Sequence, residues 1–331
     1  MPKVSGVGGM VSFEAKFRAG LAARGITVTQ NLEDEDYQAI LVIGGSRQLP
    51  ALRRAARRGI RVVQRLDGMN WLQRKTRTGL RHWLRAETAN LLLAYIRDSL
   101  ANHIVYQSQF VKGWWARQYR QNQTPSRVIY NGVDLGSFSP KGPERPPNDH
   151  IRILILEGSL QGGYELGLES GTALAAGLQS ALGQPVRLAV AGQVGAAVRQ
   201  KWNANNTAIE WLGVLPNAQV PALCRGAHLL YSSDINAACP NSVIEALACG
   251  LPVLAYDTGA LPEMVPDSAG RVVPYGGDPW QLDPPDIAAL VQGAQAILAD
   301  LDNLRAGARQ QAEAAFGLEA MLDAYIGALH G

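Results

Sequence analysis

Cysteine, uninterrupted apolar segments and acidic residues in the first half are all scarce in this chain of 331 residues. Its three cysteines, Cys224, Cys239 and Cys249, form no C-x-x-C pair, which argues against a disulfide framework and against a zinc site. No segment reaches ~18 uninterrupted apolar residues, and the opening "MPKVSGVGGMVSFEAKF" lacks the apolar run of a signal peptide. These absences predict a cytoplasmic protein without a membrane span.

The remaining composition is that of an ordinary globular protein. Hydrophobic residues make up 47% of the chain and charged residues 18%, which favours sizeable buried cores over disorder. A chain of this length holds two domains at about 100–200 residues per domain.

Basic residues are concentrated in residues 1–150, which contain 23 Lys and Arg against 11 Asp and Glu. Residues 151–331 reverse this balance, with 8 against 17. Much of the positive charge lies in residues 53–85, whose second part interleaves two tryptophans with Arg74, Lys75, Arg77, Arg81 and Arg85. This pattern is typical of a basic helix that faces solvent, the anionic inner face of a membrane, or an anionic acceptor. Nucleic acid is not expected as a partner, because no base-reading module accompanies the charge.

Short apolar runs alternate with helical patterns along most of the chain, on both sides of a Pro-rich, charged linker at 141–150. The runs expected to be buried strands are 39–45, 60–68, 103–110 and 127–134 before the linker, and 151–159, 186–192, 209–215 and 228–233 after it. Such alternation predicts an α/β protein with two doubly wound, Rossmann-like domains, residues 1–140 and 151–315. Ligands of such sheets lie at the carboxyl ends of the strands, so we expect the two domains to face each other across a cleft.

Residues 239–265, "CPNSVIEALACGLPVLAYDTGALPEMV", predict a short helix followed by a buried strand. Asn241 and Ser242 are residues of the N-cap type, and the apolar residues after them recur at helical spacing. Gly250 is placed to end the helix, Pro252 prevents its continuation, and "PVLAY" then has the composition of a buried strand. Glu245 is unusual, because it lies about one turn inside a helix that is otherwise apolar.

Four segments together resemble the family 4 retaining glycosyltransferases of the GT-B fold. They are "GVGGMVSFEAKFRAGLAARGITVT", "IYNGVDLGSFSP", "WLGVL" and, most specifically, "PNSVIEALACGLPVLAYDTGALPEMV". The resemblance implies transfer of a sugar from a nucleotide sugar to an acceptor with retention of the anomeric configuration. It also implies that the carboxy-terminal domain binds the nucleotide, that the amino-terminal domain binds the acceptor, and that the final helix, 316–331, returns to the first domain.

The resemblance further implies a set of donor-binding residues. In that family, the glycine-rich loop and the helix entrance contact the diphosphate, and the helix glutamate, here Glu245, binds the ribose hydroxyls. A helix entrance suits a diphosphate because its backbone N–H groups and dipole favour negative charge. A structural acid near the helix dipole is the alternative role for Glu245. The donor-binding candidates are Gly8, Gly9, Gly158, Ser159, Gly162, Gly163, Gly192, Gly213, Val214, Pro240, Asn241, Ser242 and Glu245.

The turn Asp67-Gly68-Met69-Asn70 follows a predicted strand, at a place where the family often carries a histidine. Asp67 and Asn70 are therefore the catalytic candidates, through contacts with the sugar or the acceptor. An Asp-Gly turn with a purely structural role fits the same residues.

Two departures from the family pattern affect the expected chemistry. Ala237 stands where the family usually has a second glutamate, eight positions before Glu245, and Ser159 stands where it commonly has an arginine. The following loop also lacks a lysine, and a buried diphosphate without a cation is unfavourable unless backbone N–H groups replace it. Gly162 and Gly163, or alternatively Arg65 and Lys75, are the candidates for that role.

These patterns predict a retaining glycosyltransferase that uses a UDP- or GDP-sugar and a glycan or lipid-linked acceptor, without a cofactor. No Asp-x-Asp pair stands at a strand end, so we expect no metal. One alternative is a catalytically silent GT-B module that binds a glycan or a partner enzyme, which Ala237 and the missing cations favour. A sugar-nucleotide epimerase is the other, although none of the five histidines stands at a convincing position for proton transfer.

Overall fold

The structure, a computed structural model, describes residues 1–4, 9–34, 36–76, 79–160, 165–203 and 209–331. The chain forms two compact units. Unit 1 comprises Met1–Gly132 and Leu318–Gly331, and unit 2 comprises Val133–Gly317. Both are α/β units built on parallel sheets, so the fold class predicted from the alternating pattern is confirmed.

Unit 1 contains a four-stranded parallel sheet in the order β1-β2-β3-β4. Its strands are β1 (Ala39–Ile43), β2 (Arg61–Leu66), β3 (His103–Tyr106) and β4 (Ser126–Val128). The first three are almost fully buried, as expected for apolar runs that helices cover on both faces. Residues 1–4, which precede the first helix, form no strand.

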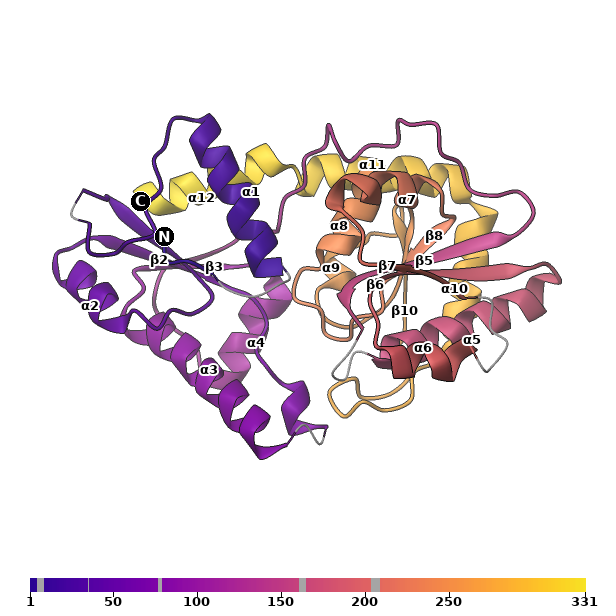
Figure 1. Cartoon of the computed structure of the whole chain (residues 1–331), viewed down its shortest axis with the longest axis horizontal. Helices are drawn as coiled ribbons and strands as arrows, with labels where there is room; N and C mark the ends of the chain where they lie inside the picture. Colours follow the sequence, from indigo (N-terminus) through magenta and orange to yellow (C-terminus); the bar gives the residue numbers. More distant parts are fainter. Residues whose placement is uncertain (5–8, 35, 77–78, 161–164, 204–208) are drawn as a thin grey trace. The chain divides into compact units, whose positions relative to one another are not determined.

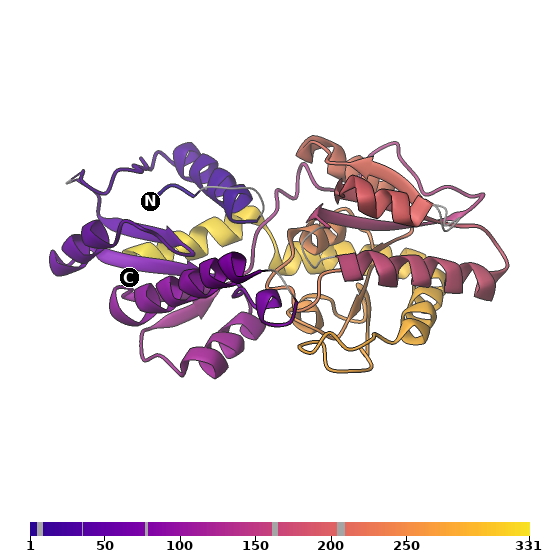
Figure 2. The same cartoon turned by 60° about the horizontal axis from the view of Figure 1, so that its bottom comes forward.

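Two helical layers cover this sheet. One core joins α1 (Gly9–Ala23) and α12 (Leu318–His330) to one face of the sheet, with the rings of Phe13, Phe17 and Tyr325 in mutual contact. A second core joins α2 (Leu49–Arg57) and α3 (Leu80–Ser99) to the other face. Figures 1 and 2 both show α12, the yellow end of the chain, beside the indigo helix α1. The remaining elements are η1 (Leu72–Arg74) and α4 (Gln109–Tyr119), which Ser108 caps by accepting from the Val111 N–H.

Unit 2 contains a six-stranded parallel sheet in the order β10-β9-β8-β5-β6-β7. Its strands are β5 (Ile151–Ser159), β6 (Val186–Gln193), β7 (Ile209–Gly213), β8 (Leu229–Tyr231), β9 (Val253–Tyr256) and β10 (Gly270–Val273). The order reverses between β5 and β8, since β5 pairs with β6 on one side and with β8 on the other. Doubly wound sheets bind ligands at such a switch point, outside the carboxyl ends of the strands.

Helices lie on both faces of this second sheet (Figure 1). The main core of unit 2 contains residues of α5 (Glu165–Leu182) and α10 (Ile287–Ala299), and α8 (Asn241–Ala248) packs against α11 (Leu301–Ala315). The shorter elements are α6 (Ala196–Asn203), η2 (Asn217–Gln219), α7 (Val220–Arg225) and α9 (Leu261–Met264). Within the described ranges, no helix has both the length and the apolar character needed to cross a bilayer.

The helix and strand predicted within residues 239–265 are present. Helix α8 ends at Ala248, Gly250 adopts φ +69°, and β9 follows as a fully buried strand. The N-cap differs from the prediction: Pro240 holds that position, and Asn241 is the first helical residue. Pro240 has extended φ and ψ angles that suit an N-cap, but it supplies no side-chain oxygen to the first turn.

Candidate functional site

The donor-binding candidates of unit 2 lie at or just beyond the carboxyl ends of its strands. Gly158 and Ser159 end β5, Gly192 lies near the end of β6, and Gly213 ends β7 with Val214 after it. Because all six strands are parallel, these ends share one edge of the sheet. Gly8, Gly162 and Gly163 lie outside the described residues.

Two of these glycines have backbone conformations that other residues rarely adopt. Gly192 has φ +143°, and a Cβ at this position would overlap the carbonyl oxygen of Glu157 on β5. Gly213 has φ +70° and has open space around it. Ser159 is exposed and lies opposite Gln193 on β6, next to an irregularity in the pairing of the two strands. The β5–β6 edge therefore depends on glycine for close packing and leaves Ser159 accessible.

The entrance of α8 combines backbone N–H donors with a half-buried acid. The first backbone N–H groups of a helix have no partner within the helix, and they carry its positive dipole end. Asn241 and Ser242, both half-buried, lie in this first turn. Glu245 is one turn further along and is also half-buried, whereas Val243, Ile244 and Ala246 around it are buried. An anion bound at this entrance would accept hydrogen bonds from the backbone N–H groups of the first turn, and the carboxylate of Glu245 would lie one turn further along the helix.

The loop that leads to α8 is tightly packed around Ala237. This residue is 3% exposed, and its carbonyl accepts a hydrogen bond from the Ala260 N–H. Gly259 has φ +62°, and a Cβ there would collide with the backbone of Ala237. Asn236 has φ +58°, in the left-handed region that asparagine tolerates better than most residues. The position at which the family usually has its second glutamate is thus a buried alanine.

Two acids at this edge were not singled out by the sequence analysis. Glu157, near the end of β5, accepts a hydrogen bond from Ser233 Oγ at 3.3 Å, and Asp234 follows Ser233 just beyond β8. Burial, and then the charge of Asp234, raises the pKa of Glu157 to about 8. Burial raises the pKa of Asp234 to about 7. One signal in the sequence pointed to this pair of acids: Glu157 stands at the end of the apolar run "IRILILE". Asp234 lies 77 residues further along the chain, so the sequence did not bring the two together.

Arg199 of α6 is a cation near this edge that the sequence analysis also missed. Helix α6 begins three residues after β6 ends, and the Arg199 guanidinium lies over the Trp211 ring at 5.8 Å. Its Nε has no hydrogen-bond acceptor among the described residues. Lys201 on the same helix instead pairs with Glu169 at 3.0 Å. Arg199 is therefore a candidate for contact with a phosphate.

In unit 1, polar residues gather at the carboxyl ends of β2, β3 and β4. Asp67 and Gln107 follow β2 and β3 and are neighbours in the register of the two strands, in which Leu66 pairs with Tyr106. Arg65 is 1% exposed, donates from Nη2 to Asn131 Oδ1 at 2.8 Å, and lies over the Phe13 ring at 4.0 Å. Nε and Nη1 of Arg65 have no hydrogen-bond acceptor among the described residues. Such a buried, incompletely satisfied guanidinium is costly in isolation.

Arg65 lies close to the carboxyl of Asp67. Its Nη1 lies 4.0 Å from Asp67 Oδ2. Burial raises the pKa of the Asp67 carboxyl, whereas the charge of Arg65 lowers it. The Trp115 indole donates to the Asp67 carbonyl at 2.9 Å, which holds the backbone of the turn in place. Asp67 is thus a half-buried acid whose carboxylate lies near the guanidinium of Arg65.

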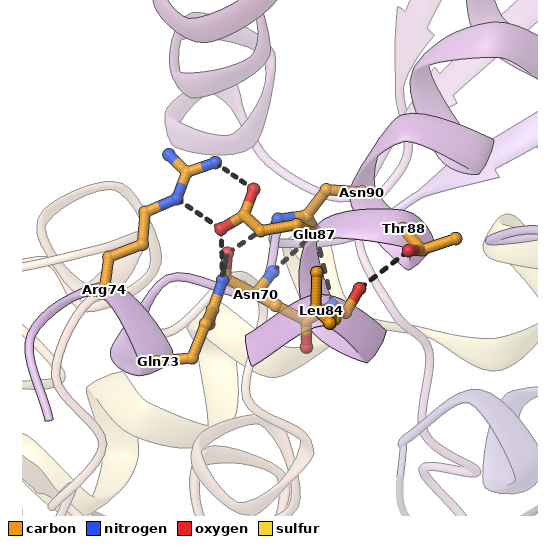
Figure 3. A network of polar contacts seen from close by, with 7 residues as sticks. All are labelled: Asn70, Gln73, Arg74, Leu84, Glu87, Thr88 and Asn90. Atoms are coloured by element: carbon orange, nitrogen blue, oxygen red, sulfur yellow. Dashed lines mark hydrogen bonds and ion pairs between the residues drawn. The ribbon is translucent and has the colours of Figure 1, made fainter. Parts of the chain in front are cut away.

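Asn70 is exposed, but hydrogen bonds connect its loop to α3 (Figure 3). Both its backbone N–H and its side-chain amide donate to Asn90 Oδ1, at 3.0 and 3.2 Å, and Asn90 Nδ2 donates back to the Asn70 carbonyl at 2.8 Å. Gln73 donates to the same carbonyl at 3.1 Å and to Glu87 Oε1 at 2.9 Å. This network gives Asn70 a structural role in closing the loop after β2.

No group of three or more histidine, cysteine, aspartate or glutamate side chains is arranged to hold a metal ion within the described ranges. Metal-independent transfer stays a prediction.

Comparison with known proteins places these features in a family context. Residues 171–300, which include α8, match the family model "Glycosyl transferases group 1". The chain is also 26% identical over 186 residues to a phosphatidylinositol N-acetylglucosaminyltransferase component from Arabidopsis thaliana. That match covers 54% of this chain and 39% of the relative, so the chain matches about two fifths of the length of this curated protein.

Solved glycosyltransferase structures resemble the whole chain at low sequence identity. The Anabaena protein HepE, in complex with UDP and glucose, has a TM-score of 0.70 at 14% identity and covers 99% of this chain and 98% of its own. Sucrose-phosphate synthase from Thermosynechococcus elongatus has a TM-score of 0.67 at 20% identity, covering 97% of this chain and 76% of its own. The resemblance inferred from the sequence motifs is confirmed: the chain has the GT-B fold of these glycosyltransferases, and residues 171–300 match the glycosyl transferases group 1 family.

Proposed function

We propose that this chain is a retaining, metal-independent glycosyltransferase that moves a sugar from a UDP- or GDP-sugar to a glycan or lipid-linked acceptor. The observation that carries the proposal is the match of residues 171–300 to a glycosyltransferase family, with α8 and Glu245 at the carboxyl edge of the unit 2 sheet. HepE is described in complex with UDP and glucose, and a pneumococcal O-GlcNAc transferase of the same fold with UDP and GlcNAc, which supports a uridine nucleotide as the donor.

The donor in this proposal binds at the edge of unit 2. The diphosphate accepts hydrogen bonds from the first turn of α8, where Pro240, Asn241 and Ser242 lie, and Glu245 accepts hydrogen bonds from the ribose hydroxyls. Gly192 allows β5 and β6 to pack closely at this edge, because a Cβ there would overlap the Glu157 carbonyl. Arg199 supplies positive charge that Ser159 does not. Gly158, Gly213 and Val214 complete the donor-binding set.

In the transfer step, the bond between the anomeric carbon and the diphosphate breaks, and the acceptor oxygen bonds to that carbon on the same face. The acceptor hydroxyl passes its proton to the departing diphosphate oxygen, on which negative charge develops as the bond to the anomeric carbon breaks. Stabilisation of this charge is the main contribution that the α8 entrance can make. In unit 1, Asp67 accepts a hydrogen bond from a sugar or acceptor hydroxyl; burial raises the pKa of its carboxyl, and the charge of Arg65, 4.0 Å away, partly offsets that rise.

A catalytically silent GT-B module is the second candidate, because specific residues favour it. Ala237 is buried where the family usually has a glutamate, and Glu157 and Asp234 place acids at the edge where the diphosphate would bind. Wherever these carboxyls are ionised, their negative charge opposes the binding of a diphosphate. A silent module binds a glycan or a partner enzyme and has no need of a nucleotide.

Thermal unfolding of the full chain with a panel of UDP, GDP, ADP and their sugar conjugates separates the two candidates. A ligand at 100 times its Kd stabilises the folded state by roughly 2.7 kcal/mol, which raises the unfolding temperature measurably. A transferase shows this rise with one nucleotide and its sugar conjugate. A chain that responds to no nucleotide contradicts the proposal and favours the silent module.

A further inference from the structure

Helix α3 exposes an unusual number of large apolar side chains. Leu80, Trp83, Leu84 and Leu91 are 75%, 41%, 51% and 63% exposed. The three leucines stand at positions i, i+4 and i+11, so they project from one side of the helix, within about 40° of arc. The other large apolar side chains that are exposed among the described residues, Met10, Ile26, Leu182 and Val214, do not gather on one element. We call the four α3 residues the α3 stripe.

An ion pair neutralises the acid on this side of the helix. Glu87 stands seven residues after Leu80, between Leu84 and Leu91, and would place a negative charge within the α3 stripe. Arg74 Nε and Nη2 bind its two carboxylate oxygens at 2.7 and 2.6 Å (Figure 3). This pairing lowers the pKa of Glu87 and raises that of Arg74. The α3 stripe therefore carries no net charge of its own.

Positive charge flanks the α3 stripe. Arg81 and Arg85 are exposed on the adjacent side of α3, and neither forms an ion pair with a described residue. Arg53 and Arg54 of α2 are engaged elsewhere, with the Tyr95 hydroxyl and with Glu33. Unit 1 as a whole contains 21 Lys and Arg against 10 Asp and Glu, a net charge of +11. A partner of this surface is thus apolar at its centre and negative around it.

We propose that the outer face of α3 lies on the surface of an anionic phospholipid bilayer, with the α3 stripe among the acyl chains and Arg81 and Arg85 at the headgroups. A helix in this position lies in the plane of the interface, buried about 5–10 Å into it, and does not cross the membrane. The sequence suggested membrane contact through the basic residues of the region 53–85. The proposed contact lies on residues 80–91 of α3, where apolar side chains insert and basic side chains bind the headgroups. The surface uses none of the donor-binding residues, so it stands apart from the proposed transfer.

Vesicle co-sedimentation of the full chain tests this surface directly. We expect binding to phosphatidylcholine vesicles that contain phosphatidylglycerol, weak binding to phosphatidylcholine alone, and a loss of binding as salt increases. Leu80→Ser, Leu84→Ser and Leu91→Ser combined should weaken partitioning by roughly a hundredfold or more, because three apolar side chains are removed from the interface. Leu182→Ser, an exposed leucine at the end of α5, is the matched control and should bind as wild type does.

Two double variants that remove the same charge test whether binding depends on α3 itself or on the overall positive charge of unit 1, which would attract anionic lipid from any position. Arg81→Gln with Arg85→Gln should weaken binding roughly thirtyfold, at about fivefold per arginine near the surface. Arg47→Gln with Arg57→Gln, exposed arginines before and within α2, removes the same charge from unit 1 and should have a much smaller effect. Equal losses in the two double variants would contradict the assignment to α3.

Fluorescence quenching by brominated lipids reports insertion without relying on the leucine variants. Vesicles with bromine near the headgroup end of the acyl chains should quench wild-type emission more strongly than that of Trp83→Phe. The proposal is overturned if quenching is the same in both proteins, or if wild type binds neutral and anionic vesicles equally. It is also overturned if wild type binds no vesicle and the leucine variant instead changes the oligomeric state, since the α3 stripe would then contact a second copy.

Discussion

Replacement of Glu157 by glutamine should change how the stability of unit 2 depends on pH. Glu157 lies at the edge of the sheet beside Asp234, with the Ser233 hydroxyl at 3.3 Å, and no described cation forms an ion pair with it. Burial and the neighbouring acid raise its pKa to about 8, above the usual value of 4.5. The folded protein therefore binds more protons than the unfolded chain between these two values, and the free energy of unfolding falls as the pH rises through this window.

The size of the effect follows from the shift in pKa. One pKa unit corresponds to about 1.4 kcal/mol, so a rise from 4.5 to about 8 sets an upper limit of roughly 5 kcal/mol. Glu157 is partly exposed, and local relaxation reduces the penalty, so we expect wild type to lose about 2 kcal/mol relative to Glu157→Gln between about pH 5 and about pH 8.

Urea unfolding of both proteins across this pH range measures the difference directly. Comparison with wild type cancels the contributions of groups that do not interact with Glu157, such as His228, whose lowered pKa of about 4 acts in the opposite direction. Glu210→Gln, which removes a carboxylate on β7 that pairs with Arg152 at 2.6 Å, is the control for loss of a carboxylate from this sheet and should not reproduce the effect of Glu157→Gln. Parallel curves for Glu157→Gln and wild type would refute the reasoning, because they would mean that Glu157 titrates alike in the folded and unfolded chain.

Two further substitutions test the packing of the two candidate sites. In urea unfolding, Gly192→Ala should destabilise unit 2 by about 3 kcal/mol or more, because a Cβ would overlap a carbonyl of β5. Gly183 also has positive φ but has open space around it, so Gly183→Ala should destabilise the protein by only about 1 kcal/mol. Asn90→Ala should destabilise unit 1 by about 2–3 kcal/mol and expose the loop at Asn70 to proteolysis, while Thr88→Ala on the exposed side of α3 should do neither.

Local elements could be predicted well because their signals are local. The run "IRILILEGS" became β5 over the predicted residues, and helix α8 with Gly250 and strand β9 followed from capping, periodicity and breaker residues. The N-cap was the exception: Asn241 has a capping side chain, but the chain places Pro240 at that position.

Contacts between distant segments could not be predicted from one sequence. Glu157 and Ser233 meet because β5 and β8 pair, and nothing in either segment specifies that pairing. The same holds for the hydrogen bond of Arg65 to Asn131, which joins residues 66 positions apart in the chain. Trp83 stood out in the sequence as part of a basic run, but the exposure of the leucines around it depends on what packs against α3.

The most direct test of nucleotide-sugar binding is calorimetric titration of wild type, Glu245→Gln and Glu245→Ala with UDP and GDP. Hydrogen bonds to a charged group contribute about 1.5–3 kcal/mol, so the alanine variant should bind about tenfold more weakly or worse, with the glutamine variant between it and wild type. Stability should fall by only about 0.3–1 kcal/mol, because a half-buried acid in the first turns of a helix contributes little through the dipole. Glu313→Ala, at an exposed carboxylate on α11, should bind as wild type does. Reduced stability with unchanged nucleotide affinity would make Glu245 a structural residue, and failure of wild type to bind either nucleotide would contradict the transferase itself.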